Sequence, residues 1–108
     1  MVVKVTLENE TKNFWTFKEV GHDTKPYDVT KNQIANAFKH LEQWQKEPDA
    51  SNFSTKLYNL MAKADFENFR KIFKGFPARA TAYSLWYHTT NKAELEKYFG
   101  GKNGSDDI

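Results

Sequence analysis

The sequence predicts a single α+β domain in which an amino-terminal antiparallel β-hairpin packs on about five short helices. Three observations predict this class: alternating apolar residues near the amino terminus, apolar residues spaced three and four apart from Ile34 onward, and a segment at residues 78–87 that is apolar on nearly every side. A helix that is apolar all round is normally enclosed by protein. We therefore expect the other elements to be arranged around Ala78 to Tyr87.

Size and composition indicate one cooperative domain. A chain of 108 residues buries roughly two-thirds of the surface that its unfolded form exposes. Aromatic residues make up 16% of the chain, so much of the buried area must come from Phe, Tyr and Trp. The net charge of +2 is too small to indicate nucleic-acid binding by itself. The lack of cysteine excludes disulfides and Cys-bound zinc, and it fits a reducing cytoplasm.

The amino-terminal region has the period of two half-buried strands. Val3, Val5 and Leu7 alternate with polar residues, residues 9–13 form a polar turn, and residues 14–20 return with side chains that suit a pleated sheet. Because two strands alone are marginal in water, the hairpin must lie on the helices or recruit a third strand, for which residues 27–29 are the candidate. Because of this alternation, we expect residues 1–8 to be neither a signal peptide nor a membrane span.

The first helix is predicted from Thr30, a suitable N-cap, to about Lys46. Pro48 ends it, because the residue before a proline is disfavoured in helical geometry. Its inward residues recur at spacings of three and four, and they are Ile34, Ala37, Phe38, Leu41 and Trp44.

Two further helices are predicted between residues 54 and 75. Ser54 caps the first of them, with a hydrophobic staple between Phe53 and Tyr58. Its buried stripe consists of Leu57, Leu60, Met61 and Ala64. Asp65 caps the next helix, whose buried face consists of Phe66, Phe69, Ile72 and Phe73.

The corner before the central helix is predicted at Gly75-Phe76-Pro77. Gly75 fits a left-handed helix stop, and Pro77 fits the first turn of the helix that follows. A β-branched residue in place of Gly75 should cost about 1 kcal/mol or more if φ is positive there.

A last short helix is predicted after Thr90 or Asn91. It turns Leu95, Tyr98 and Phe99 inward and stops at Gly100. The compact domain therefore spans residues 1–100. We expect the polar tail at residues 101–108 to be flexible, because it has almost nothing to bury.

No motif in the sequence indicates catalysis, a cofactor or a metal. None of the three histidines, at positions 22, 40 and 88, stands three or four residues from another, as a metal-binding helix motif requires. No Ser lies in a nucleophile elbow, and no Gly-rich loop joins a strand to a helix. The carboxylates weighed as an acid/base pair stand where first-turn or surface charge is expected, and they are Asp65, Glu67, Glu94 and Glu96. We expect the protein not to be an enzyme.

The strongest polar signal is the segment from Lys56 to Arg79, which contains six basic residues and only two acidic ones. The predicted partner-binding residues are Lys56, Lys63, Arg70, Lys71, Lys74 and Arg79. They are compatible with contact to the acidic face of a host protein, with contact to nucleic acid, or with a plain solvated surface. Three short helices with a tight corner could form a helix-turn-helix, but the third would offer only Arg79, Thr81 and Ser84 to base edges.

The aromatic excess is a second signal, because a domain of this size need not enclose all of its large aromatic residues. Those in question are Trp15, Phe17, Trp44, Tyr58, Tyr83, Trp86, Tyr87 and Tyr98. They either fill the core or form a protein-binding patch, which could also join two copies of the chain.

Two segments near the carboxyl end, FPARATAYSLWYHT at residues 76–89 and ELEKYFG at residues 94–100, carry a family resemblance. This last quarter of the chain resembles the ending of small uncharacterised proteins encoded by phages and prophages of Gram-positive bacteria. The resemblance implies a small binder or inhibitor of host machinery in the bacterial cytoplasm, including an anti-CRISPR or other anti-defence role. It supplies no catalytic residues that transfer to this sequence.

Overall fold

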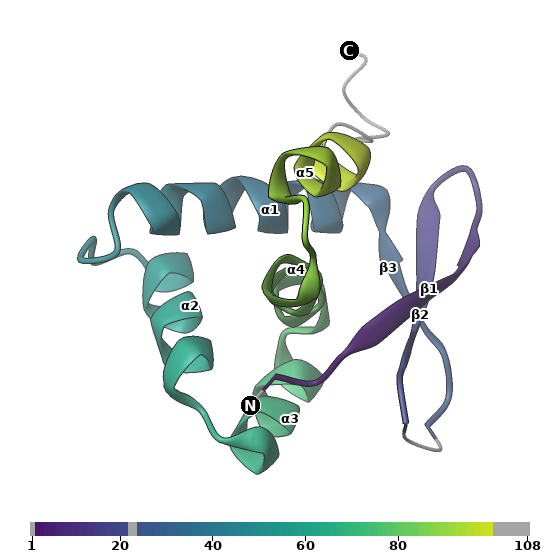
Figure 1. Ribbon diagram of the computed structural model, residues 1–108, viewed down its shortest axis with the longest axis horizontal. Helices are drawn as coiled ribbons and strands as arrows, with labels where there is room; N and C mark the ends of the chain where they lie inside the picture. Colours follow the sequence, from purple (N-terminus) through teal and green to yellow (C-terminus); the bar gives the residue numbers. More distant parts are fainter. Residues whose placement is uncertain (1, 22–23, 101–108) are drawn as a thin grey trace.

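The computed structural model of the protein describes residues 2–21 and 24–100, and it confirms the predicted α+β class. A three-stranded antiparallel sheet comes first in the chain, and five helices follow it. Figure 1 shows the sheet at one end of the domain and α2 at the other, with α4 between them. The predicted flexible tail lies outside the described residues.

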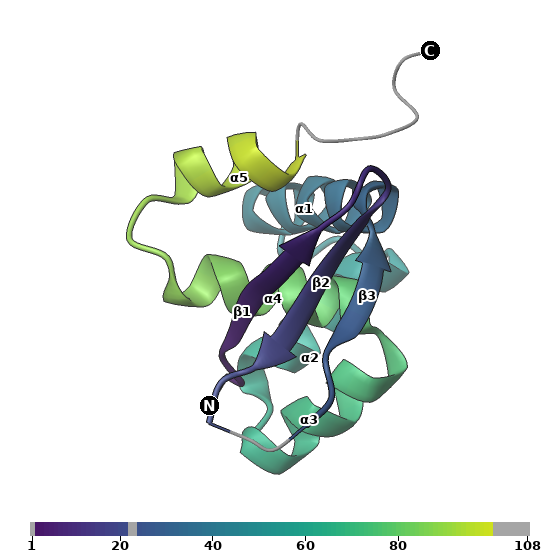
Figure 2. The same ribbon diagram turned by 90° about the vertical axis from the view of Figure 1, so that its right-hand side faces the viewer.

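The sheet has the strand order β1-β2-β3, and its strands are β1 (Val5–Glu10), β2 (Phe14–Glu19) and β3 (Tyr27–Thr30). The hairpin therefore recruits the third strand that residues 27–29 suggested. Trp15, Phe17 and Val29 are buried on the face that meets the helices. Figure 2 shows the sheet from its other face, with α4 crossing behind it.

Helix α1 (Lys31–Lys46) begins and ends where the sequence predicted. Thr30 and Gln33 form a capping box: the Thr30 hydroxyl oxygen accepts from the Gln33 backbone N–H, and the Gln33 side-chain oxygen accepts from the Thr30 backbone N–H, both at 3.0 Å. This cap fixes the corner between β3 and α1.

Helix α4 (Pro77–His88) is the central helix, as predicted, and it packs against β1 and all four other helices. Ala80 and Ala82 are fully buried. The hydroxyls of Thr81 and Ser84 are also buried. Thr81 lies 2.6 Å from the Tyr27 hydroxyl, and Ser84 donates to the Val3 carbonyl. The middle of the helix is enclosed, while its two ends are open to water at Pro77 and at Tyr87 and His88.

Helix α2 (Phe53–Lys63) begins two residues earlier than predicted. Asn52 is the N-cap, because its side-chain oxygen accepts from the Thr55 backbone N–H at 2.9 Å. Ser54 lies inside the helix and is buried, so the predicted cap was wrong, and so was the staple between Phe53 and Tyr58. Leu60 was also predicted inward, but it is 54% exposed.

Helix α3 (Phe66–Gly75) is capped by Asp65 as predicted, but the left-handed stop at Gly75 was wrong. Within the described part of the chain, only Gly21 has a positive φ, at 81°. Phe76 makes the corner instead, with φ −138° and ψ 66°, because a residue before proline is pushed out of the helical region. Pro77 occupies the first turn of α4 as predicted.

Helix α5 (Lys92–Gly100) is held by one aromatic residue. Phe99 is buried against Trp15 and Phe38, at ring-centroid distances of 4.9 and 6.0 Å. Tyr98 was predicted inward but is 42% exposed at the edge of Trp15. Among the described residues, no helix combines the length and the apolar character needed to cross a membrane.

Candidate binding surface

The outward side of α2 carries an unusual row of side chains, Phe53, Lys56, Leu60 and Lys63, which we call the α2 outer strip. Their spacing of three, four and three residues places them on one helical face. Phe53 and Leu60 are 60% and 54% exposed, the highest values for large hydrophobic residues in the described part of the chain. The strip therefore alternates an open apolar residue with a lysine.

The amino-terminal end of the strip continues onto the corner before α4. The ring of Phe53 lies 5.5 Å from that of Phe76, centroid to centroid, and the Arg79 guanidinium lies 5.9 Å from the Phe53 ring centre. Both aromatic residues are exposed. Aromatic residues, Phe among them, and arginine are enriched in the cores of protein–protein interfaces.

The carboxyl-terminal end of the strip opens into a groove of about 410 Å³ between α2 and α3. Leu60, Ala64 and Ile72 give the groove its apolar lining. Lys63 and Lys71 add a basic residue from each of the two helices. Asp65, the cap of α3, also lines the groove, so two basic residues and one acidic residue surround a space that can receive an apolar side chain.

The structure separates the six predicted partner-binding residues. Lys56 and Lys63 lie on the strip itself, and Arg79 and Lys71 lie at its two ends. Arg70 lies elsewhere: its guanidinium is 3.6 Å from a Glu19 carboxylate oxygen on β2, so it joins α3 to the sheet. Lys74 is exposed on α3 but does not line the groove.

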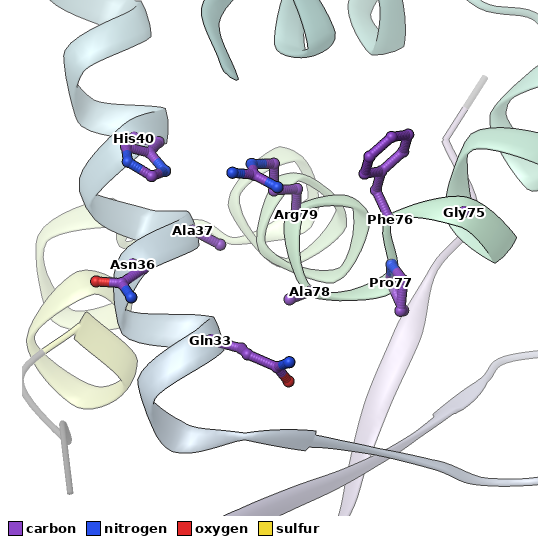
Figure 3. Close-up of a pocket in the computed structure, with 9 residues that line it drawn as sticks. All are labelled: Gln33, Asn36, Ala37, His40, Gly75, Phe76, Pro77, Ala78 and Arg79. Atoms are coloured by element: carbon purple, nitrogen blue, oxygen red, sulfur yellow. The ribbon is translucent and has the colours of Figure 1, made fainter. Parts of the chain in front are cut away.

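A pocket adjoins the Arg79 end of the strip, between α1 and the first turn of α4. It has a volume of about 340 Å³, and its lining includes His40 and Arg79 (Figure 3). The pKa of His40 is lowered from its ordinary value, first by burial and then by the positive charges of Arg79 and Lys39.

The central helix is not available as a recognition helix for DNA. Thr81 and Ser84, two of the three polar residues that it would present, are buried and bonded within the domain. Their side chains cannot reach base edges unless the fold opens. The helix-turn-helix interpretation is therefore left with Arg79 alone on that helix.

The predicted carboxylates take structural positions. Asp65 caps α3, and Glu67 and Glu94 lie in the first turns of α3 and α5. Glu96 shares a depression of about 320 Å³ with Glu42 of α1. Partial burial, and then Glu42, raise the pKa of Glu96. No group of three or more potential metal ligands occurs within residues 2–21 and 24–100.

Sequence reasoning missed the exposure of Phe53 and Leu60 and the pocket beside His40. The sequence did contain a signal for the strip. Leu57, Tyr58 and Met61 form one complete buried stripe of α2, so a second row of residues on another face of the same helix is expected to be exposed. The pocket had no such signal, because His40 and Arg79 are brought together only by the packing of α1 on α4.

Comparisons with known proteins give no relative for this chain: no protein-family model, curated protein or solved structure matches it. The likeness of its carboxyl end to phage proteins therefore stays a prediction. Function has to be inferred from the geometry of the surface.

Proposed function

We propose that this chain is a small non-enzymatic protein of a phage or another mobile element, and that it binds a host protein and modulates it. The α2 outer strip is the observation that carries this proposal. The phage resemblance favours an anti-defence inhibitor, including an anti-CRISPR protein, that acts in the cytoplasm of the bacterial host.

The chemistry of the strip favours a protein partner with an acidic face. Burying a large apolar side chain such as that of Phe53 or Leu60 is worth about 1.5–3 kcal/mol when burial is complete. Lys56 and Lys63 alternate with these residues and would pair with carboxylates at the rim of the contact, which mainly sets orientation and association rate. The partner should therefore offer apolar pockets between acidic residues.

Nucleic-acid binding is the alternative, and the same lysines would then contact phosphates. The apolar residues argue against it, since Phe53 and Leu60 alternate with the lysines and have no complement on a duplex backbone. Binding to mixed-sequence duplex or single-stranded DNA at low salt, with a steep loss of affinity as salt rises, would favour this alternative. Under the proposal, no such binding is seen.

The test is affinity capture from a lysate of a Gram-positive bacterium, read by mass spectrometry. The wild type is compared with Lys56→Glu/Lys63→Glu and with Phe53→Ser/Leu60→Ser. The matched control, Lys4→Glu/Lys12→Glu, makes the same charge change next to β1, with Lys4 directly before that strand and Lys12 in the turn between β1 and β2. One host protein should be captured by the wild type and the control and lost with both strip variants.

Two controls make this result interpretable. Circular dichroism must show that each variant is folded, and light scattering must establish whether the strip joins two copies of the chain. Retention of the same partner by both folded strip variants would remove α2 from the proposal. A wild-type dimer that both strip variants dissolve would identify a second copy as the occupant.

A further inference from the structure

The pocket between α1 and α4 is large enough for a small polyatomic ion. Its volume of about 340 Å³ is roughly ten times that of a water molecule in the liquid. Figure 3 shows the guanidinium of Arg79 pointing toward the imidazole of His40, while the amide of Gln33 reaches toward Ala78. Side chains from two different helices therefore converge on one space.

The two basic side chains keep unused donors there. Nε of Arg79 and Nδ1 of His40 are both buried, and neither has a hydrogen-bond partner among the described residues. Buried polar atoms are normally hydrogen-bonded. Because Nε of arginine always carries a proton, and Nδ1 carries one in the imidazolium form, both can donate to the same acceptor.

Positive charge around this space comes from Arg79, which lines it, and from Lys39 nearby. None of the described residues that line it is acidic, and the first turn of α4 contains no acidic residue. Lys39 adds positive charge from α1 itself. From α2, the Tyr58 hydroxyl is turned away, since it donates to the Ala37 carbonyl at 2.7 Å. The corner residues, Gly75 to Pro77, do not titrate.

We infer that this pocket binds an oxyanion, a phosphate-type or carboxylate group, between Arg79 and protonated His40. A guanidinium presents two parallel N–H donors to the oxygens of such a group, and the imidazolium adds a donor from the opposite wall. The inference does not depend on the identity of a protein partner, because a small anion in solution binds in the same way as a carboxylate on a partner.

Anion binding and protonation of His40 must be linked. The anion favours the charged imidazolium, so its binding raises the pKa of His40, and lowering the pH strengthens binding. Each unit by which the pKa rises corresponds to about tenfold tighter binding to the protonated form than to the neutral one. The pocket is thus expected to fill more readily below neutral pH.

The experiment follows the His40 ring signals by NMR during titration with sodium sulfate or sodium acetate, with sodium chloride at equal ionic strength as the reference. Sulfate represents the phosphate-type group, and acetate represents a carboxylate. The expected result is a saturable change at His40 and a rise of about one unit in its titration midpoint. His88 is the internal control, because its Nδ1 lies 2.9 Å from the Ser84 carbonyl, outside the pocket.

Variants distinguish the pocket from general charge effects. Arg79→Gln should weaken sulfate binding about tenfold or more, while Arg70→Gln, which removes the same charge elsewhere, should leave it unchanged. Arg79→Lys keeps the charge and should bind, but more weakly. A response to sulfate alone assigns a phosphate-type ligand, and a response to acetate as well extends the assignment to carboxylates.

The inference is overturned if His40 in the wild type responds to neither anion more than to chloride, or if its shift follows that of His88 without saturating. Equal sulfate binding by folded Arg79→Gln and wild-type protein would also overturn it. The wild-type titration stands without any variant, so a variant that fails to fold does not remove the test.

Discussion

Helix α4 and helix α2 both carry aromatic and polar residues at close spacing, yet the fold uses them in opposite ways. On α4, Tyr83 is enclosed and the Thr81 and Ser84 hydroxyls are bonded to other elements of the domain. On α2, one face is buried and the other leaves Phe53 and Leu60 open to water. The comparison shows that an aromatic or polar residue indicates a binding surface only if it is not required to fill the core or to bond within it.

The largest expected contrast in stability is between Tyr83 and Leu60. Tyr83 packs against the rings of Trp44, Tyr58, Phe69 and Trp86. Tyr83→Ala should therefore lower the free energy of unfolding by about 3–5 kcal/mol. Leu60→Ala should change it by no more than about 0.5 kcal/mol. Urea denaturation measures both, and similar losses for the two variants would abolish the contrast between the helices.

A smaller effect tests whether the polar residues of α4 are internal anchors. Thr81→Val removes the hydroxyl that lies 2.6 Å from that of Tyr27 and leaves the Tyr27 hydroxyl without this partner. The free energy of unfolding should fall by about 1–3 kcal/mol. Thr81→Ser keeps the hydroxyl and serves as the control. A valine variant as stable as the wild type would show that the hydroxyl pair contributes nothing.

Alanine in place of glycine should have effects of opposite sign at Gly75, which ends α3, and at Gly21, which follows β2. A Cβ added at Gly75 meets nothing within 4 Å, and its backbone is helical, so Gly75→Ala should stabilise the fold by about 0.4–1 kcal/mol. Gly21 has φ 81°, so Gly21→Ala should destabilise it by about 1 kcal/mol. Thermal or urea denaturation measures both effects. A loss of stability in Gly75→Ala would support the left-handed conformation that the sequence predicted at Gly75.

The smallest expected effect is on the pH dependence of the free energy of unfolding. His40 contributes to it from the pocket between α1 and α4. Because its pKa is lowered in the folded state, the unfolded chain binds a proton more tightly. The resulting stability is present above the ordinary pKa of 6.5 and is lost as the pH falls through the lowered value. His40→Asn should therefore lose less stability than the wild type between about pH 7.5 and about pH 5.5.

Denaturation midpoints at the two pH values measure this effect, and His88→Asn is the control. If the wild type and His40→Asn lose stability in parallel, the pKa of His40 is not lowered in the folded protein. Carboxylates that titrate at lower pH affect both proteins equally, so the difference between them isolates His40.

Local sequence signals predicted most of the fold. The first strand, the caps at Thr30 and Asp65, and Pro77 at a helix start each depend on a few neighbouring residues, and each was confirmed. The bounds of the strand were wrong, because β1 begins at Val5 and continues to Glu10, into the turn predicted at residues 9–13. Where two local options competed, the prediction failed. Both Asn52 and Ser54 can cap a helix, and either Gly75 or the residue before Pro77 can make a corner.

The candidate site was less predictable, because it depends on contacts between distant parts of the chain. The positive run from Lys56 to Arg79 overlaps the α2 outer strip and its two ends, but Arg70 turned to Glu19, a partner that only the packing of α3 on the sheet could reveal. The exposure of Leu60 likewise depends on which face of α2 meets the core. The pocket between His40 and Arg79 joins residues almost forty positions apart, and no spacing rule covers such a pair.

The most direct test of the central claim is photo-cross-linking from single positions on the surface. A benzophenone amino acid replaces Phe53 or Leu60 on the α2 outer strip, or Phe14, which is 42% exposed on the sheet. The chain is then irradiated in a lysate of a Gram-positive bacterium. We expect positions 53 and 60 to give adducts of one common size, and position 14 to give none of that size. Adducts of that size from position 14 alone, or none from positions 53 and 60, would contradict the account.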